Sequence, residues 1–312
     1  MSFKDTSVVI IVVTYNGMPW IDACLRSCQN YPVIVIDNQS TDGTVRYIQT
    51  HFEEVLVFEQ DRNLGFGQAN NLGITKALAL GFENVFLLNQ DAYLGAGCLD
   101  VLMEAAAKNS EYGILSPIHL NGSGLDYDTQ FFKYATIAGP HLPSEFNKLG
   151  VVKSLFQVPY INAAAWFVTK NCLEQVGGFD PLFFHYGEDN NYCQRVRYSG
   201  LSVGVVTHAF VRHDRESRPK LIVEPGSVIY FDRLERKLKS RYGDITQANF
   251  KDLKQLQYKR FKEFIKAMLR FQLTEARIKI QEVLLIKRLL PLIQASRTRN
   301  STQTIKRYLC SN

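Results

Sequence analysis

The stretch SVVIIVVTYNG, residues 7–17, joins an unbroken apolar segment to a polar one that begins at Thr14. β-Branched residues dominate the apolar part, which predicts a strand over residues 7–13. Similar apolar segments predict three further strands, at 33–37, 54–60 and 84–91. A helix is expected after each strand, at 20–29, 41–52, 67–81 and 97–109. The first third of the chain therefore alternates strands with helices.

This alternation predicts an α/β fold with a mostly parallel, Rossmann-like central sheet and helices on both of its faces. Strands that are buried on both sides account for apolar runs without polar interruptions. In such sheets, ligands bind beyond the carboxyl ends of the strands. Polar residues stand at these ends, namely Thr14, Tyr15, Asn16, Asp37, Asn38 and Asp91. The sequence therefore predicts a ligand site at this edge of the sheet.

The pattern of the sequence changes twice in the later part of the chain. Residues 118–160 mix Gly, Pro and aromatic residues, so we expect loops with short strands there. Residues 163–213 return to strands and helices, with one helix starting near Glu188. The remaining chain shows long helical patterns. We therefore place a domain boundary near 225–230, with a first domain over 1–228 and a basic, mostly helical region over 229–312.

Composition narrows the class of protein. Hydrophobic residues make up 46% and charged residues 21%, which predicts a chain with a substantial core. The six cysteines form no CxxC pair and no zinc-site spacing, as expected for reduced thiols in a cytosolic protein. The apolar run at 8–13 lacks a basic leader and a cleavage site. No stretch has the roughly 18 apolar residues that span a bilayer. We therefore expect a cytoplasmic protein.

Charge is distributed unevenly along the chain. Residues 230–312 contain 20 Lys and Arg against 7 Asp and Glu, a balance of +13. Residues 1–229 have a balance of −7, which leaves the net charge of +6 for the whole chain. An acidic body with a basic tail predicts that the tail contacts an anionic surface.

Five motifs follow one another along the chain, namely VVTYNG (12–17), VIDNQSTDGT (35–44), DRNLGFGQANNLGI (61–74), LLNQDAYL (87–94) and GEDNNYCQRVRYSG (187–200). Their order resembles that of the inverting glycosyltransferases of family 2, and most closely their bacterial rhamnosyltransferase branch. The resemblance covers roughly residues 7–215. It implies a GT-A fold, with the nucleotide-binding part over about 1–115 and the acceptor part over about 116–228. It also implies transfer of a sugar from a nucleoside diphosphate to a hydroxyl, usually with a divalent metal.

The resemblance assigns the donor site to the first strand ends. Asp37 would accept the imide N–H of a uracil or thymine base, and the base and ribose would contact Thr14, Tyr15, Asn16 and Asn38. A structural alternative is that Asp37 orders the turn DNQSTDG. Both interpretations stay open.

The segment DRNLGFGQANN would close one side of the donor site, with contributions from Arg62, Gly65, Gly67 and Asn70. Only G-x-G is present and it follows the third strand, so this is no dinucleotide fingerprint. The glycines would let the backbone approach the ligand closely. Arg62 is equally consistent with a solvated surface arginine.

The resemblance places a metal at Asp91, the last residue of Asn89-Gln90-Asp91, with Asn89 and Gln90 near the donor. Mg²⁺ or Mn²⁺ shares one or two carboxylates with substrate phosphates, so a single aspartate is compatible with such a site. His213 matches the position of a further metal ligand. A lone histidine is otherwise more often structural.

Glu188-Asp189 matches the family's acidic pair at a helix start. An inverting transfer needs one base to take the proton of the attacking hydroxyl. By family position, Asp189 is expected to be that base and Glu188 to orient the acceptor. The alternative is that both residues only complement the helix dipole. On the acceptor side we expect aromatic contacts from Trp166, His185 and Tyr186.

The basic tail has two interpretations. Residues 252–270 place apolar residues at helical spacing between Lys and Arg, as in a helix bound to an anionic membrane surface. The same pattern fits helices that pack on the first domain or on a second copy of the chain. A position on the inner face of the plasma membrane would suit a lipid-linked acceptor. Nucleic-acid binding is disfavoured, because no nucleic-acid motif accompanies the charge.

The resemblance favours dTDP-rhamnose as the donor, followed by UDP-sugars, and a glycan or lipid-linked glycan of the cell surface as the acceptor. Two other classes were weighed. A sugar nucleotidyltransferase would carry a Gly-rich, basic phosphate loop after the first strand, where TYNGMPW stands instead. A non-catalytic glycan-binding or scaffold protein would not need Asp91, Asp189 and His213.

Overall fold

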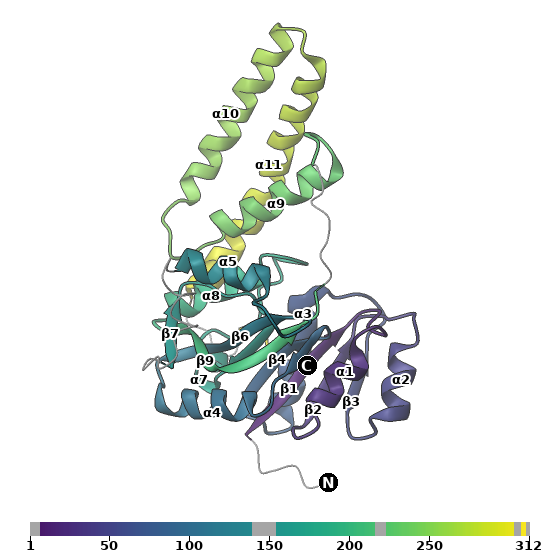
Figure 1. Cartoon of the computed structure of the whole chain (residues 1–312). Helices are drawn as coiled ribbons and strands as arrows, with labels where there is room; N and C mark the ends of the chain where they lie inside the picture. Colours follow the sequence, from purple (N-terminus) through teal and green to yellow (C-terminus); the bar gives the residue numbers. More distant parts are fainter. Residues whose placement is uncertain (1–6, 139–153, 216–222, 303–306, 310–312) are drawn as a thin grey trace.

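The computed structural model describes residues 7–138, 154–215, 223–302 and 307–309. Within these residues, nine strands form one sheet in the order β3-β2-β1-β4-β8-β6-β9-β5, and β7 pairs with β9 (Figure 1). The strands are β1 Val8–Thr14, β2 Val33–Asp37, β3 Leu56–Glu59, β4 Asn84–Asn89, β5 Ala92–Leu94, β6 Tyr112–Asn121, β7 Leu155–Val158, β8 Ala165–Val168 and β9 Ser202–His213. The helices of the body are α1 Ile21–Ser27, α2 Thr44–His51, α3 Gly65–Ala79, α4 Cys98–Lys108, α5 Thr129–Ala138, α7 Lys170–Gln175 and α8 Glu188–Tyr198.

The sheet is mostly parallel, as predicted. Strands β3, β2, β1 and β4 are all paired in parallel. β8 is antiparallel to both β4 and β6, and β6 is parallel to β9, so six strands point one way. β5 and β7 are each antiparallel to β9. The predicted α/β fold class is confirmed.

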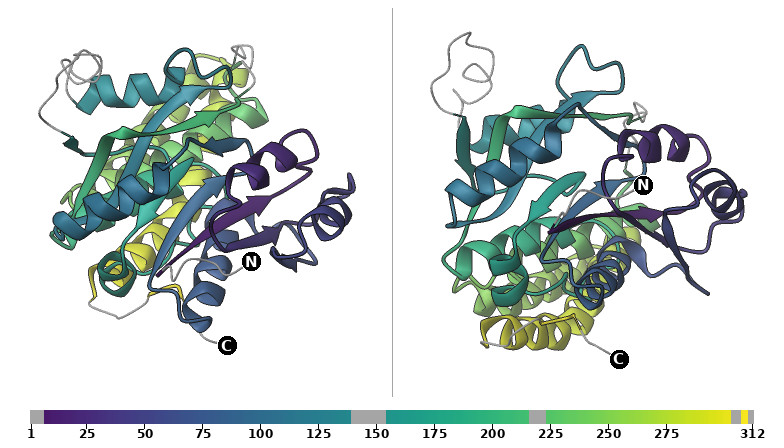
Figure 2. Two further views of the ribbon diagram at one scale, coloured as in Figure 1. Left: turned by 60° about the horizontal axis from the view of Figure 1, so that its bottom comes forward. Right: turned by 90° about the horizontal axis from the view of Figure 1, so that it is seen from below.

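Helices cover both faces of the sheet (Figure 2). Successive side chains of a strand point to opposite faces, and both sets are apolar in β1. Val9 and Ile11 lie in one core cluster with residues of α3, α7 and α8. Val8, Ile10 and Val12 lie in the other, with residues of α1, α2 and α4. Burial on both faces is why this strand is an unbroken apolar run.

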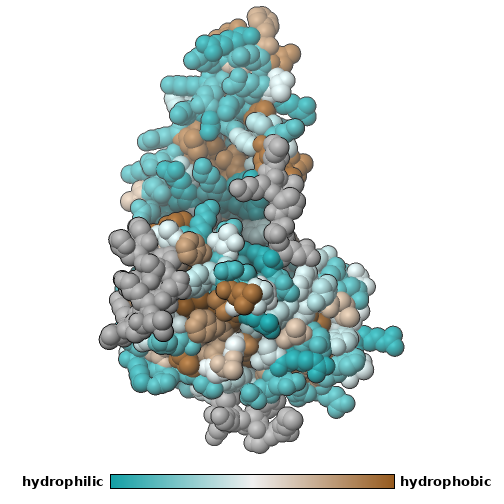
Figure 3. Space-filling model, viewed as in Figure 1, coloured by the Kyte–Doolittle hydropathy of each residue, from teal (hydrophilic) through white to brown (hydrophobic). Residues whose placement is uncertain are grey.

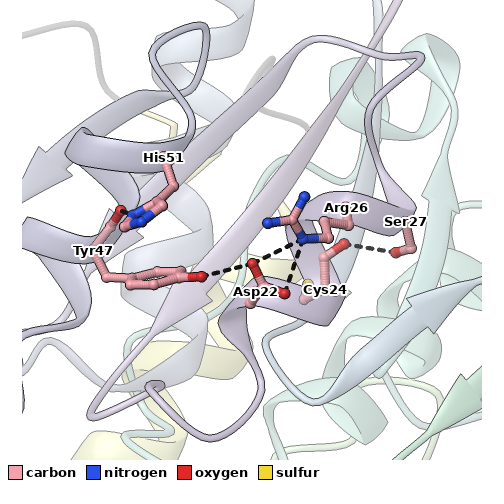
Figure 4. Close-up of polar contacts among 6 residues, drawn as sticks. All are labelled: Asp22, Cys24, Arg26, Ser27, Tyr47 and His51. Carbon is pink, nitrogen blue, oxygen red and sulfur yellow. Dashed lines mark hydrogen bonds and ion pairs between the residues drawn. The ribbon is translucent and has the colours of Figure 1, made fainter.

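On the sheet face that is covered by α1, α2 and α4, a polar contact joins α1 to α2 (Figure 4). Asp22 accepts a hydrogen bond of 2.8 Å from the hydroxyl of Tyr47 and forms an ion pair of 2.9 Å with Arg26. The Arg26 and Tyr47 hydrogen bonds hold the pKa of Asp22 below its ordinary value. Ser27 donates to the carbonyl of Cys24 within the same helix. These contacts fix the outer helices against each other.

The expectation of loops with short strands over 118–160 was wrong for residues 129–138, which form the helix α5. The long strand β6 starts before this segment and ends within it, at Asn121. Pro117 lies inside β6, although proline has no N–H for a sheet hydrogen bond. The register of β6 against β9 shifts between Pro117 and Ile118, so the proline stands at an irregularity of the strand. Residues 139–153 of this expected loop segment lie outside the described residues.

The C-terminal region consists of α9 Val228–Tyr242, α10 Phe250–Leu269 and α11 Leu273–Ser301. Helices α10 and α11 form a hairpin that projects away from the sheet (Figure 1). Leu253, Leu285, Leu289 and Ile293 form a small core with α9 at the base of this hairpin. α11 continues through Pro291. None of the helices in the described residues is long and apolar enough to cross a membrane.

The C-terminal helices also bind the first domain directly. The buried carboxylate of Asp180 accepts hydrogen bonds of 2.6 Å from Ser296 and from Asn300, both on α11. The carbonyl of Arg307 accepts a hydrogen bond of 2.7 Å from the backbone of Gly178. One of the two alternatives for the tail, packing on the first domain, is therefore observed for α11.

Candidate functional site

The carboxyl ends of three neighbouring strands bring the predicted donor residues together. Thr14 is the register partner of Asp37, and Val13 is the partner of Asn89. The hydroxyl of Thr14 donates a hydrogen bond of 2.9 Å to Asp37, and both side chains are buried. The structure thus joins β1, β2 and β4 at a single polar edge, as the sheet order requires.

Asp37 orders the turn that follows β2. Its second carboxylate oxygen accepts a hydrogen bond of 2.9 Å from the backbone N–H of Ser40. Asn38 is also buried; its side chain accepts from the N–H of Leu64 and donates to the carbonyl of Gly65. The structural alternative for Asp37 is therefore present in the molecule. This leaves the base contact of Asp37 as a proposal.

The loop after β1 is held by side chains from the turns that follow β4 and β2. The amide of Gln90 accepts from the N–H of Tyr15 at 3.0 Å and donates to its carbonyl at 3.3 Å. Asn16 adopts a left-handed conformation, with φ of 49°, and its N–H donates to Ser40. Tyr15 itself is 50% exposed, so its ring is free to contact a ligand.

The glycines of the third motif serve a different neighbour from the one we expected. A Cβ on Gly65, where φ is +77°, would lie 2.1 Å from the carbonyl oxygen of Phe184. A Cβ on Gly67 would lie 3.0 Å from Phe179. The close backbone approach is therefore to the chain that leads into α8. Asn70 is buried and donates to the carbonyl of Phe66, whereas Arg62 is exposed.

Asp91 and His213 meet across β5 and β9. Ala92 is the register partner of His213, and Nε2 of the histidine lies 3.3 Å from the Asp91 carboxylate. Nδ1 of the same ring lies 3.7 Å from the carboxylate of Asp128, which sequence reasoning missed. Burial alone would raise the pKa of Asp91, but the His213 ring holds it below its ordinary value. His213 is thus placed between two carboxylates.

These residues fit a divalent metal that shares its coordination with a ligand. The His213 ring is buried, and its two nitrogens face Asp91 and Asp128 without hydrogen-bond geometry to any group in the described residues. A buried imidazole whose nitrogens are not engaged in hydrogen bonds is suited to coordination. The described residues contain no cluster of three His, Cys, Asp or Glu side chains that could hold a metal. Asp91 and His213 would therefore need oxygen atoms from a bound diphosphate.

The acidic pair lies at the start of α8. The hydroxyl of Tyr160 donates a hydrogen bond of 2.7 Å to Asp189, and the N–H of Asn190 donates to its other oxygen. Burial raises the pKa of Asp189, although the Tyr160 hydrogen bond opposes that rise. Burial and the charge of Asp189 raise the pKa of Glu188 to about 8. One oxygen of the buried Glu188 carboxylate has no partner in the described residues. The pair thus combines an oriented carboxylate with a neighbour that favours protonation.

Helix α5, which sequence reasoning missed, links His213 to the acidic pair. Asp128 caps this helix by accepting hydrogen bonds from the N–H groups of Gln130 and Phe131. Further along the helix, the Tyr134 ring contacts the Tyr160 ring edge-on, with centroids 4.8 Å apart. The start of α5 therefore contacts His213 through Asp128, and the same helix contacts Tyr160 through Tyr134. An acidic N-cap three residues before Phe131 was the one local signal available in the sequence.

The expected acceptor-side residues separate in the structure. Trp166 is fully buried, and its ring is stacked on that of Phe179, so our prediction of an acceptor contact is wrong for this residue. It lies on β8, opposite Leu87, where a strand inside the sheet buries its side chain. His185 and Tyr186 lie on the loop before α8 with exposed side chains. Tyr186 has φ of 67°, a strained value for a residue with a large side chain.

Comparison with known proteins defines the class. The model of the family described as glycosyl transferase family 2 matches residues 9–175, which is more than half of the chain. The chain therefore belongs to family 2 of the glycosyl transferases, and the enzyme class predicted from its motifs is confirmed at this level.

Two characterised relatives are rhamnosyltransferases. N-acetylglucosaminyl-diphospho-decaprenol L-rhamnosyltransferase of Mycobacterium tuberculosis is 26% identical over 234 residues, which cover 67% of this chain and 76% of the relative. The dTDP-rhamnosyl transferase RfbF of Shigella flexneri is 24% identical over 209 residues, which cover 65% of this chain and 67% of the relative.

Among solved structures, GalNAc-T7 with UDP, GalNAc and Mn²⁺ aligns with a TM-score of 0.52 at 14% identity. The alignment covers 77% of this chain and 52% of GalNAc-T7, so this chain matches about half of that structure's length. This likeness shows the shared GT-A fold.

Proposed function

We propose that this protein transfers L-rhamnose from dTDP-rhamnose to a hydroxyl of a glycan or lipid-linked glycan, with inversion at the anomeric carbon. The observation that carries the reaction is the half-buried Asp189, held by Tyr160 at the start of α8. The choice of sugar is supported by the names of the two relatives. A lipid-linked acceptor is supported by the name of the Mycobacterium tuberculosis relative, which includes N-acetylglucosaminyl-diphospho-decaprenol, and the dTDP donor by the name of the Shigella flexneri relative.

The donor nucleotide would occupy the edge formed by β1, β2 and β4. Tyr15 would offer its exposed ring to the base, and the buried Asp37 and Asn38 would lie beneath the nucleotide. The same strand ends also carry Asn16, Asn89 and Gln90. The exposed cation of Arg62 lies on the loop between β3 and α3. The contacts among Thr14, Asp37 and Ser40 preorganise this edge before the nucleotide binds.

Asp91 and His213 would hold Mg²⁺ or Mn²⁺ together with the donor diphosphate. The bound metal would stabilise the negative charge that develops on the leaving diphosphate. Its use is supported by the Mn²⁺ in the structure of GalNAc-T7. Asp128 would orient the His213 ring from its other nitrogen, as outer carboxylates commonly do for metal-bound histidines.

Asp189 would act as the general base. The acceptor oxygen forms a bond to the anomeric carbon while the bond from that carbon to the diphosphate oxygen breaks. The electron pair of the broken bond leaves with the diphosphate, and the proton of the acceptor hydroxyl moves to Asp189. A raised pKa brings the base closer to the working pH and strengthens it as a proton acceptor. A protonated Glu188 would donate a hydrogen bond to the acceptor without competing for its proton.

The test is release of nucleoside diphosphate from a panel of dTDP-, UDP- and GDP-sugars with Mg²⁺ or Mn²⁺ and a lipid-linked sugar acceptor. We expect turnover with dTDP-rhamnose. Turnover with a UDP-sugar alone would correct the donor and retain the reaction. No release with any donor and acceptor would favour a non-catalytic glycan-binding protein.

The variant Asp189→Asn tests the base. We expect a loss of kcat of about 10³-fold, because a positioned base contributes on the order of 10²–10⁴-fold. The dissociation constant for dTDP, measured by calorimetry, should stay unchanged. Asp252→Asn is the matched control, since Asp252 is exposed on α10. Retained turnover in Asp189→Asn would remove this residue from the role.

A further inference from the structure

The far end of the α10–α11 hairpin is apolar on its outside. The residues of its turn are among the most exposed large apolar side chains of the described residues, with Leu269 at 76%, Phe271 at 88% and Leu273 at 66%. Figure 3 shows apolar side chains gathered at this end of the hairpin. Ala267 and Ala276 are buried between the helices, so the hairpin closes on small residues and leaves its large ones outside. Such a cluster marks an interaction site.

The apolar surface continues from the turn along α10. Tyr258, Phe261, Ile265 and Met268 are spaced by three and four residues, which places them on one face of the helix. They are between 42% and 61% exposed, so α11 does not cover them. At the base of the same hairpin, in contrast, Leu253 and Leu289 are buried against α9. The far half of the hairpin is therefore built to meet something outside the chain.

Unpaired positive charge surrounds this apolar surface. Residues 258–279 contain seven Lys and Arg against two acidic residues. Arg260 and Lys279 are paired with Glu263 and Glu282, at distances from 2.6 to 3.5 Å. Five exposed cations remain without an ion pair in the described residues, namely Lys259, Lys262, Lys266, Arg270 and Arg277.

The positive charge favours an anionic lipid surface over a second copy of the chain as the partner of this surface. A second copy of the chain would bring its own five cations against these five, and like charges repel. An anionic lipid surface complements the cations and accepts apolar side chains between its headgroups. The exposed turn, with Phe271 at its end, has the shape needed to enter that layer without a membrane-spanning helix.

We propose that the far end of the α10–α11 hairpin, formed by residues 258–279, docks the protein on an anionic membrane surface. Phe271, Leu269 and Leu273 enter the headgroup layer, and the surrounding cations bind the lipid phosphates. The hairpin is anchored in the first domain through Ser296 and Asn300 on Asp180, so docking at its end fixes the position of the whole molecule. The proposal rests on the hairpin alone and is independent of the sugar transferred.

Sedimentation of the full chain with vesicles tests this surface. We expect binding to phosphatidylcholine vesicles that contain phosphatidylglycerol, and binding at least about tenfold weaker to phosphatidylcholine alone. High salt should weaken binding to the anionic vesicles. Absence of binding to anionic vesicles at low salt would overturn the proposal.

Two variants separate the contributions. Leu269→Ser with Phe271→Ser removes apolar area, and its matched control is Leu80→Ser with Leu125→Ser, which lie exposed on the body. Lys262→Glu with Lys266→Glu and Arg270→Glu reverses charge, and its control is Arg46→Glu with Lys108→Glu and Lys133→Glu. Each hairpin variant should lose about tenfold or more in vesicle affinity, while the controls bind as the parent does.

Gel filtration without lipid tests whether a second copy of the chain covers this surface instead. Equal vesicle binding by the parent and both hairpin variants would overturn the proposal. So would a parent oligomer that the apolar variant converts to monomer, because the surface would then be an interface between copies. Circular dichroism of each variant checks that the helices remain folded.

Discussion

The proposed donor side and the proposed acceptor side of this enzyme are built in different ways. The proposed donor side consists of the ends of adjacent parallel strands, where Thr14 donates a hydrogen bond to Asp37. On the proposed acceptor side, Tyr160 donates to Asp189 at the start of α8, and the preceding chain is held on α11 by the hydrogen bond from Ser296 to Asp180. The first side is therefore built from the sheet itself, and the second depends on packing between the body and the C-terminal helices.

The two sides nevertheless meet at the third motif. Gly65 and Gly67 belong to the donor segment by sequence, yet they pack against Phe184 and Phe179 on the acceptor side. The third motif thus packs directly against the chain that leads into α8. The predictions below test how strongly each side depends on the other.

Gly65→Ala should have the largest effect on stability. The added Cβ would meet the Phe184 carbonyl at 2.1 Å, and φ is +77°. We expect a loss of about 3 kcal/mol in the free energy of unfolding, from backbone strain plus overpacking. Gly81→Ala is the control, because φ is +90° there and nothing lies within 4 Å. Urea denaturation that gives equal losses for both variants would mean that the contact with Phe184 adds nothing.

Asp180→Ala should destabilise the acceptor side next. It leaves the buried donors of Ser296 and Asn300 without their carboxylate, which costs about 2 kcal/mol. Because Asp180 lies on the chain leading into α8, kcat should fall while dTDP affinity is retained. Asp232→Ala, at an exposed position on α9, is the matched control. Loss of dTDP affinity in Asp180→Ala would show that the two sides are not separable.

His213→Asn tests the donor side through metal binding. Mn²⁺ affinity should be weak without nucleotide and should rise when dTDP is present, since the protein offers few ligands of its own. The variant should weaken Mn²⁺ binding in the presence of dTDP by about tenfold. His208→Asn is the control, because His208 lies exposed on the same strand. Calorimetry that shows the same Mn²⁺ affinity in both variants would exclude His213 as a ligand.

Tyr160→Phe should have the smallest effect at neutral pH and a clear one in acid. The Tyr160 hydrogen bond lowers the pKa of Asp189, so its loss raises that pKa further. A base must be deprotonated to act, and the acidic limb of the kcat/KM profile should therefore move up by about one pH unit. Tyr198→Phe, half-exposed on α8, should leave the profile unchanged. An unshifted limb in Tyr160→Phe would argue that the limb reports another group.

Sequence patterns predicted the regular elements well where periodicity and burial agree. The strand expected at 33–37 is β2 without change, and the long helices of the tail are present. They failed over residues 129–138, where a segment with mixed aromatic residues forms a helix. They also failed for Trp166, because aromatic character alone does not distinguish a core ring from one that contacts a sugar.

The sequence by itself determined the α/β class, the family and the polar strand ends, because alternating burial and local motifs are written along the chain. Only the tertiary structure brought Asp128 to His213 and Tyr160 to Asp189, since these pairs join segments without a shared local pattern. It also decided that the base of the C-terminal hairpin is core and its far end is surface. Both halves have the same amphipathic pattern, and only one has α9 to pack against.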